Sequence, residues 1–170
     1  TYVLPLIDYE GDHWKDDRDY IAAFKCMRAI NALPIPKVMH NGMYDATHSI
    51  AHNVEPLHYT LDTMYLAHSE FSELPKSLDF VASYHLYDYV FWKDEADHAG
   101  KKRDQEAYWA YNARDTWYTA RILIEQLRNA NTYAFTNYKE NFPTIYPALY
   151  CNFEGVLVDN NKRAELREVA

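Results

Sequence analysis

Glycine and cysteine are both scarce in this chain. Only four of its 170 residues are glycine, which argues against a glycine-rich β-barrel and favours long helices. The two cysteines, Cys26 and Cys151, are too few and too far apart to indicate a disulfide framework. A reduced intracellular setting is therefore expected.

Long apolar runs and an excess of positive charge are also missing. No segment approaches the roughly 18 apolar residues that a membrane span requires, so no membrane partner is expected. The first residues carry no basic segment and do not read as a signal peptide, so secretion is not expected. The net charge of −8 argues against a general basic surface for nucleic acid. An acidic chain can still process DNA when its carboxylates hold divalent metals, because the metals then carry the local positive charge.

What the sequence does contain is an alternation of strand-like and helical segments. Strands are predicted over residues 2–7 and 37–40, and a third over 57–64 that runs into a short helix. Helices are predicted over residues 18–33 and 43–52, from Ser77, and over 104–128 and 141–153, with a last helix beginning after Asp159. The charged segment 94–103 is predicted to be a surface loop. This alternation places the chain in the α/β or α+β class.

The longest predicted helix, residues 104–128, has apolar side chains at steps of three and four residues. Such a stripe is typical of a helix face that packs on a core. We expect the following residues to be buried: Trp109, Ala113, Trp117, Ala120, Ile124 and Leu127.

Two short patterns carry groups suited to catalysis. Asn41 and Asp45 stand at a strand-to-helix junction, whereas Tyr111 and Asp115 stand four residues apart on one face of the longest helix. A carboxylate with a phenol one turn away suits two-metal phosphodiester hydrolysis: Asp115 would hold Mg²⁺ or Mn²⁺ and Tyr111 would orient the attacking water. Each pattern also has a plainer interpretation. Asp45 alone could be a helix cap, and the Tyr111–Asp115 pair could be a solvated surface pair.

The order of these patterns resembles that of the 3′–5′ proofreading exonuclease of family A DNA polymerases, a member of the DEDD superfamily. Residues 36–45 look like the second exonuclease motif, Asn-x3-Asp with an aromatic residue before the Asp. Residues 61–64 and 74–78 are similar to the segments that follow it, and residues 111–119 resemble the third motif in its tyrosine-bearing form. Residues 146–159 resemble the segment where the polymerase domain begins, which RNase D relatives lack.

This resemblance implies a ribonuclease H-like exonuclease fold, a mixed sheet flanked by helices, with its N-terminal strands missing. Residues 1–130 would form the truncated exonuclease domain, and residues 131–170 a linker helix and the beginning of the polymerase domain. The implied partners are the single-stranded 3′ end of DNA and the rest of the polymerase chain, whereas a processivity factor stays open. The implied location is the cytoplasm of a bacterial cell or a phage-infected host.

The resemblance also implies roles for individual residues. Asp45 and Asp115 would be catalytic carboxylates that hold Mg²⁺ or Mn²⁺, and Tyr111 would position the nucleophilic water. Asn41 would touch the DNA strand or brace the site. Asp62, in the segment after the second motif, is expected to be a structural cap or hydrogen-bond acceptor.

The family's first motif, Asp-x-Glu on the first strand, has one candidate here, Asp8-Tyr-Glu10. Too few residues separate it from Asp45 for the two further strands that the exonuclease sheet places between them. Pro5 would also lack the N–H that a central strand needs. Asp8 and Glu10 are therefore interpreted as a solvent-facing turn. The true motif is expected upstream of Thr1, so these residues alone should not degrade DNA.

Two further sets of polar residues are given weaker roles. His48 and His52 could hold zinc, but no third ligand follows at a typical spacing. A basic set is expected to lie on a solvated loop or to pair with helix ends rather than to bind phosphate; it comprises Lys101, Lys102, Arg103, Arg121 and Arg128.

Three functions therefore remain open. The first is a metal-dependent 3′–5′ exonuclease of a DNA polymerase, which releases nucleoside monophosphates. The second is a non-catalytic module with an exonuclease-like fold that grips DNA or braces the polymerase domain. The third is an RNA-processing exonuclease related to RNase D. An Asp-x-Glu on an apolar strand upstream would favour an enzyme over the module.

Overall fold

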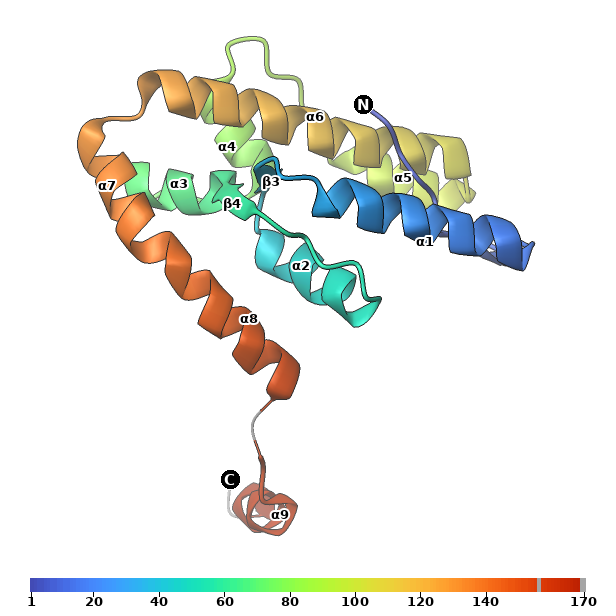
Figure 1. The fold of residues 1–170 in the computed structure, drawn as a ribbon. Helices are drawn as coiled ribbons and strands as arrows, with labels where there is room; N and C mark the ends of the chain where they lie inside the picture. Colours follow the sequence, from blue (N-terminus) through green and yellow to red (C-terminus); the bar gives the residue numbers. More distant parts are fainter. Residues whose placement is uncertain (156, 169–170) are drawn as a thin grey trace.

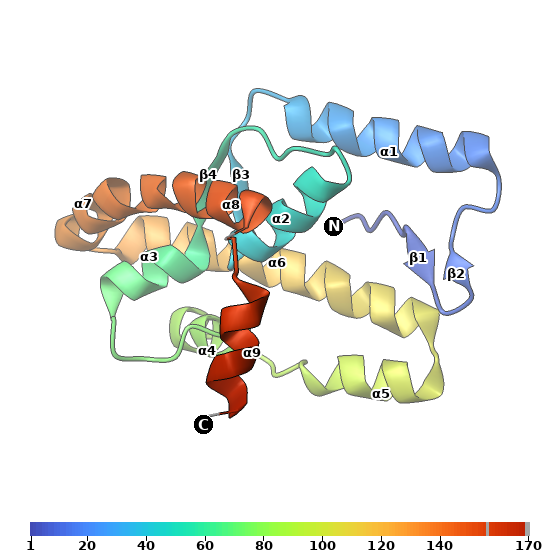
Figure 2. The ribbon, with the colours of Figure 1, turned by 90° about the horizontal axis from the view of Figure 1, so that it is seen from below.

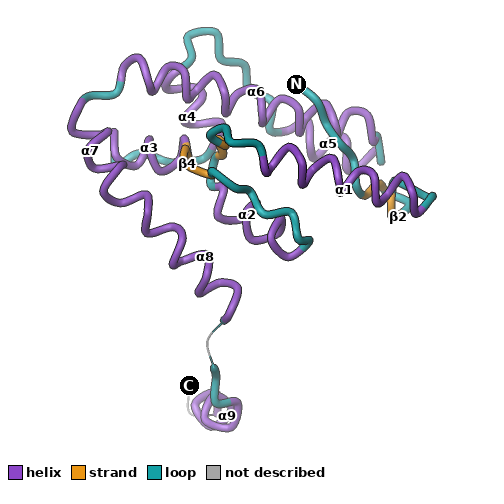
Figure 3. Tube along the Cα trace, viewed as in Figure 1, coloured by secondary structure: helices purple, strands orange, loops and turns teal. Residues whose placement is uncertain are grey.

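The computed structural model describes residues 1–155 and 157–168 and is mostly helical (Figure 1). The elements in chain order are β1 Ile7–Asp8, β2 Gly11–Asp12, α1 Asp17–Ala32, β3 Lys37–Met39, α2 Gly42–Ala51, β4 Tyr59–Asp62, α3 Thr63–Glu70, α4 Leu78–His85, α5 Asp94–Lys102, α6 Gln105–Asn129, α7 Thr132–Asn141, the 3₁₀ turn η1 Phe142–Thr144, α8 Ile145–Glu154 and α9 Asn160–Glu168. Strands form only short pieces between the helices (Figure 3). The mixed α/β class is confirmed, and the ribonuclease H-like fold stays a prediction.

The parallel pair β3–β4 positions the start of two helices. Val38 pairs with Leu61 and Met39 with Asp62, so the two strands end side by side. Because the strands are parallel, α2 and α3 begin next to each other at the same end of the sheet. Along its other edge, β3 pairs with no strand in the described part of the chain.

The predicted strand over residues 2–7 is wrong. Only Ile7–Asp8 is a strand, and it pairs antiparallel with Gly11–Asp12 in a separate hairpin. The proline in this segment has no N–H for a ladder, and its carbonyl instead accepts a hydrogen bond from the Trp14 indole at 2.6 Å. The Asp8–Glu10 turn is confirmed, since the Asp8 carboxylate accepts from the Glu10 N–H at 2.8 Å.

The predicted loop over residues 94–103 is also wrong, because Asp94–Lys102 forms helix α5, which packs against α6 (Figure 2). The charges that suggested a loop instead complement the helix: acidic residues begin it, and Lys101 and Lys102 lie in its last turn. The high density of charged residues alone therefore led to a wrong prediction. The order of the charges, acidic residues first and basic residues last, indicates the helix.

Helix α6 lies where residues 104–128 predicted a helix, capped by the Asp104 side chain, but it buries a different face. Trp117, Ile124 and Leu127 of the predicted stripe are exposed by 45 %, 47 % and 51 %. The buried residues are Tyr118, Thr119, Ile122, Leu123 and Gln126. Helices α3 and α4 pack on this second face. Apolar side chains occur on both faces, so periodicity alone did not show which one meets the neighbouring helices.

Helix α1 is confirmed within one residue of its predicted start, and the Asp16 side chain caps it by accepting from the Arg18 N–H. Its predicted apolar face is only partly covered. Tyr20, Phe24 and Met27 are half-buried, whereas Ile30 is 54 % exposed.

Helices α7 and α8 form an arm that leaves the end of α6 and passes β4 (Figure 1). The sequence predicted a helix only from residue 141, whereas α7 begins at Thr132 with an Asn131 side-chain cap. Tyr138, Phe142 and Ile145 of this arm pack with Tyr59 and Leu66 in one buried cluster. The arm is therefore part of the core that supports β4.

Two hydroxyl groups fasten the arm to β4. The Tyr138 hydroxyl accepts from the Asp62 N–H at 2.9 Å and donates to the Thr60 carbonyl at 3.1 Å. The Tyr146 hydroxyl donates to the Tyr59 carbonyl at 2.5 Å. Strand β4 thus receives from the arm hydrogen bonds that a neighbouring strand would otherwise supply.

Tyr138→Phe is expected to lower the free energy of unfolding by about 1–3 kcal/mol, because it leaves the buried Asp62 N–H without its partner. Urea unfolding measures the difference. Tyr133→Phe is the control, since Tyr133 is 77 % exposed and should change stability by less than about 0.5 kcal/mol. Equal effects of the two substitutions would show that the Tyr138 hydroxyl does not anchor the arm.

Within the described residues, no helix is both long and apolar enough to cross a membrane.

Candidate functional site

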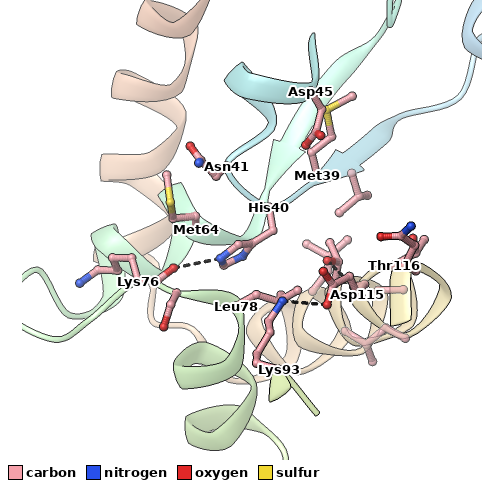
Figure 4. A pocket seen from close by; sticks show the side chains of 17 residues that line it. Met39, His40, Asn41, Asp45, Met64, Lys76, Leu78, Lys93, Asp115 and Thr116 are labelled. Carbon is pink, nitrogen blue, oxygen red and sulfur yellow. Dashed lines mark hydrogen bonds and ion pairs between the residues drawn. The ribbon is translucent and has the colours of Figure 1, made fainter. Parts of the chain in front are cut away.

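A cavity of about 1070 Å³ lies between the end of β3, the start of α4, and helix α6. Its walls carry the residues that follow β3 and one side of α6, and Asp45 and Asp115 reach it from α2 and α6 (Figure 4). The polar residues that line it are His40, Asn41, Asp45, Lys76, Ser77, Lys93, Asn112, Asp115, Thr116 and Thr119. Asp45 and Asp115, far apart in the sequence, therefore face one shared space.

The Asn41–Gly42 pair has a structural explanation. Asn41 takes the left-handed conformation, with φ of 59°, which asparagine tolerates better than most residues. A Cβ atom at Gly42 would lie within 2.6 Å of Met39 and of the Tyr59 hydroxyl, so no larger residue fits. This tight turn starts α2 at the rim of the cavity. The Asn41 side chain makes no cap hydrogen bond and lines the cavity instead.

Asp62 holds this turn in place. Its carboxylate is 1 % exposed and accepts hydrogen bonds from the starts of both α2 and α3. The backbone donors are the N–H groups of Asn41, Gly42, Met64 and Tyr65. The expected role of Asp62 as a structural cap is confirmed, because every one of these contacts is internal to the fold.

Asp45 does not cap α2, since Asn41 occupies the N-cap position and Asp45 lies in the first turn. The residue is exposed at the cavity. Loss of water around the carboxyl group and then repulsion from Asp62 raise the pKa of Asp45 above its ordinary value. Such a carboxylate gains from a cation more than a fully solvated one does. The plainer interpretation of Asp45 as a cap is therefore wrong.

Asp115 and Tyr111 lie on one face of α6, as their spacing predicted, and the Lys93 ammonium joins them. Its Nζ donates to Asp115 Oδ1 at 2.8 Å and to the Tyr111 hydroxyl oxygen at 3.0 Å. The Trp92 indole N–H donates to the same Oδ1 at 2.7 Å. Asp115 lines the cavity, whereas Tyr111 is half-buried and is not among the residues that line it. The pair is thus part of a network and not a solvated surface pair.

The Lys93 ammonium stays charged in this network. Burial lowers the pKa of Lys93, but hydrogen bonds to Asp115 and Tyr111 outweigh burial and raise it overall. The ammonium also lies 5.0 Å from the ring centres of both Trp92 and Tyr111, a distance that gives cation–π attraction.

Among the described residues, no group of three or more His, Cys, Asp or Glu side chains could hold a metal ion. Asp45 and Asp115 supply hard oxygen ligands of the kind that Mg²⁺ and Mn²⁺ prefer, but two carboxylates are fewer than a two-metal site needs. His48 and His52 likewise gain no third ligand from the residues that the structure describes.

Three arginines of the predicted basic set have structural partners. Arg121 forms an ion pair with Asp88, and Arg128 pairs with Glu125. Arg103 donates to the Tyr9 carbonyl at 2.8 Å. Arg128 lies in the last turn of α6, where pairing with the helix end was predicted, whereas Arg121 pairs with a side chain instead.

His40 also faces the cavity, and the pH dependence of stability reports how far His40 is buried. Its Nε2 donates to the Lys76 carbonyl at 2.9 Å, and its Nδ1 lies 2.8 Å from the Thr63 hydroxyl. Burial is the main cause that lowers the pKa of His40 below its ordinary value of 6.5. The unfolded chain therefore binds the His40 proton more readily than the folded chain.

We expect the free energy of unfolding to fall as pH drops below about 6.5, by up to about 1.4 kcal/mol per pH unit from His40 alone. The stabilisation from His40 is fully present above the ordinary pKa of histidine. It is lost as pH falls toward the lower pKa that His40 has in the folded protein. Urea unfolding at about pH 7.5 and about pH 5 measures the change. His40→Asn should make the pH dependence shallower. An unchanged pH dependence in this variant would contradict the account.

The sequence analysis missed Trp92, Lys93 and His40. Nothing in the spacing of Trp92 and Lys93 connects them with Asp115, because they lie on a loop whose path depends on packing. His40 directly precedes the Asn41 motif, so its neighbours in the sequence could have indicated it.

Scans of this chain against protein-family models, curated proteins and solved structures each give no significant match. A function therefore has to follow from the side chains that line the cavity.

Proposed function

We propose that this chain carries the 3′–5′ proofreading exonuclease site of a family A DNA polymerase. The observation that supports it most is the shared cavity, which Asn41 and Asp45 approach from one motif and Asp115 from the other. The Tyr111 hydroxyl lies next to Asp115 through their common partner, Lys93. The two patterns that resemble exonuclease motifs are thus combined in one place by the fold.

The chain's own residues suit distinct parts of the reaction. Asp45 and Asp115 would hold Mg²⁺ or Mn²⁺ by their carboxylate oxygens. A bound metal ion supplies Lewis-acid stabilisation of the leaving 3′ oxygen and a more acidic attacking water. The Tyr111 hydroxyl would orient that water toward the terminal phosphodiester, and Asn41 at the rim would contact the DNA strand. The cleaved bond would release a nucleoside monophosphate.

The open edge of β3 offers a place for the further carboxylates. Val38 and Met39 of this strand line the cavity that separates it from α6. A strand that carries Asp-x-Glu in a longer form of the protein would pair along this edge. Its acidic side chains would then lie between Asp45 and Asp115, and the sheet would grow toward the ribonuclease H-like arrangement.

The end of α8 agrees with the proposed start of a polymerase domain. The helix ends at Glu154, and Gly155 follows with φ of 72° and ψ of −172°, a conformation that is essentially confined to glycine. The resemblance places an acidic residue and Gly-Val at this point. We accordingly propose residues 1–130 as the exonuclease part and residues 131–170 as the connection to the polymerase part.

The test uses the longer protein that carries this chain, with Mg²⁺ and DNA labelled at its 5′ end. The proposal predicts progressive shortening from an unpaired 3′ end, release of nucleoside monophosphates and loss of activity on chelation of Mg²⁺. An RNA strand of the same sequence should be degraded more slowly. Preference for RNA would instead support the RNase D-like alternative.

A specific observation also favours the non-catalytic module. The Lys93 ammonium already forms an ion pair with Asp115, so this carboxylate has a cationic partner without a metal ion. Under this alternative the longer protein binds single-stranded DNA but degrades none of it in Mg²⁺ or Mn²⁺. The same assay therefore separates the two functions.

A further inference from the structure

The loop between α4 and α5 is held rigidly against α6. The Trp92 ring stacks on the Tyr118 ring, with 3.9 Å between their centres and 15° between their planes, and Trp92 is 2 % exposed. The Tyr118 hydroxyl also donates to the Val90 carbonyl at 3.1 Å. The packing of Trp92 therefore fixes the position of the next residue, Lys93, beside the cavity.

Lys93 determines how the Tyr111 hydroxyl can point. An ammonium group donates hydrogen bonds and cannot accept them, so the Tyr111 oxygen is the acceptor in their 3.0 Å contact. The hydroxyl hydrogen of Tyr111 must then point away from Lys93. One lone pair of this oxygen is occupied. Within the part of the chain that the structure describes, no hydrogen bond uses the remaining lone pair or the hydrogen, and these could orient a water molecule.

Lys93 and Trp92 also determine which oxygen of Asp115 is available. Both donate to Oδ1, at 2.8 Å and 2.7 Å. Among the described residues, none donates a hydrogen bond to Oδ2. The carboxylate is thus held by one oxygen, and the other can bind a cation.

We propose that Lys93 is a positioning residue of the exonuclease site, which fixes the Asp115 carboxylate for metal binding and the Tyr111 hydroxyl for water orientation. This inference rests on the function proposed above. It adds a residue that acts through Asp115 and Tyr111.

A purely structural role of the Lys93–Asp115 ion pair would lead to a different expected result. The Lys93 and Asp115 side chains are 26 % and 31 % exposed, and partly exposed pairs of this kind contribute at most about 1 kcal/mol to stability. Loss of Lys93 should therefore affect stability little. If Lys93 positions the site, its loss should affect turnover much more.

The experiment compares Lys93→Met and Lys93→Arg in the longer protein. We expect Lys93→Met to lower turnover on single-stranded DNA about 10- to 100-fold at saturating Mg²⁺, as loss of a residue that orients a metal ligand does. Mn²⁺ binding, measured by calorimetry, should become tighter, because the positive charge of the ammonium no longer repels a cation at Asp115 Oδ2. Lys93→Arg should restore much of the turnover, since a guanidinium can donate to both partners.

Lys139→Met is the matched control, because Lys139 is an exposed lysine on α7 and should leave turnover and Mn²⁺ binding unchanged. Full turnover in Lys93→Met, together with loss of activity in Asp115→Asn, would overturn the role of Lys93 and leave the proposed function standing. Full turnover in both variants would instead overturn the proposed function. Equal loss of turnover in the Met and Arg variants, with a large loss of stability, would show that Lys93 only supports the fold.

Discussion

Asp115→Asn is expected to lower exonuclease turnover of the longer protein by about 100-fold or more. The amide keeps an oxygen that can accept from Trp92 and Lys93, so the local packing should survive. What the variant loses is the negative charge that would hold a metal ion. Loss of metal stabilisation amounts to several kcal/mol in the transition state, and about 1.4 kcal/mol corresponds to a tenfold change in rate.

The control for this variant is Glu125→Gln on the same helix. Glu125 pairs with Arg128 and does not line the cavity, so turnover should stay unchanged. Rates are measured by release of nucleoside monophosphates, and urea unfolding confirms that both variants remain folded. If Asp115→Asn degraded DNA as fast as the unchanged protein, Asp115 would have no part in catalysis.

Asp62→Ala is expected to cause the largest loss of stability, about 3–5 kcal/mol in the free energy of unfolding. The substitution removes the acceptor of four backbone N–H groups at the starts of α2 and α3. It also leaves the buried Tyr59 hydroxyl without the carboxylate to which it donates. Buried donors that lose their partner are each costly because no water replaces it.

Asp16→Ala provides a matched comparison for Asp62→Ala. Asp16 also caps a helix, but it is exposed and accepts from one N–H, that of Arg18. Its loss should lower the free energy of unfolding by about 1 kcal/mol. Urea unfolding of both variants measures the difference. Similar effects would mean that Asp62 does not hold the starts of two helices together.

The sequence predicted local elements well where one residue determines the local geometry. Asp104 caps α6 with its side chain near the predicted residue, whereas Ser77 precedes α4 as expected but makes no side-chain cap hydrogen bond. Side-chain caps act within a few residues, so the local sequence contains their signal. The position of Tyr111 and Asp115 on one face of α6 was also predictable, because it depends only on the helical repeat.

The choice of buried face on α6 could not be predicted in this way. Trp117 and Ile124 match the helical repeat as well as Tyr118 and Ile122 do, yet only the second pair is buried. Which face is covered depends on where α3 and α4 pack, and that is a property of the whole fold. The position of Lys93 next to Asp115 depends on the same packing.

The motif around Asn41 shows how local and functional signals can overlap. Asn41 and Gly42 satisfy the backbone conformation and the tight contact of the turn, so these residues need no catalytic role. Asp45 has no such explanation, because it neither caps α2 nor is buried. Within this motif, the functional proposal therefore depends chiefly on Asp45.

The most direct test is to locate Mn²⁺ in crystals of the longer protein by its anomalous scattering. The proposal predicts an ion in the cavity, with carboxylate oxygens of Asp45 or Asp115 at about 2.1 Å and with the Lys93 ammonium still hydrogen-bonded to Asp115 Oδ1. Mn²⁺ bound only outside the cavity, with neither Asp45 nor Asp115 as a ligand, would contradict the account.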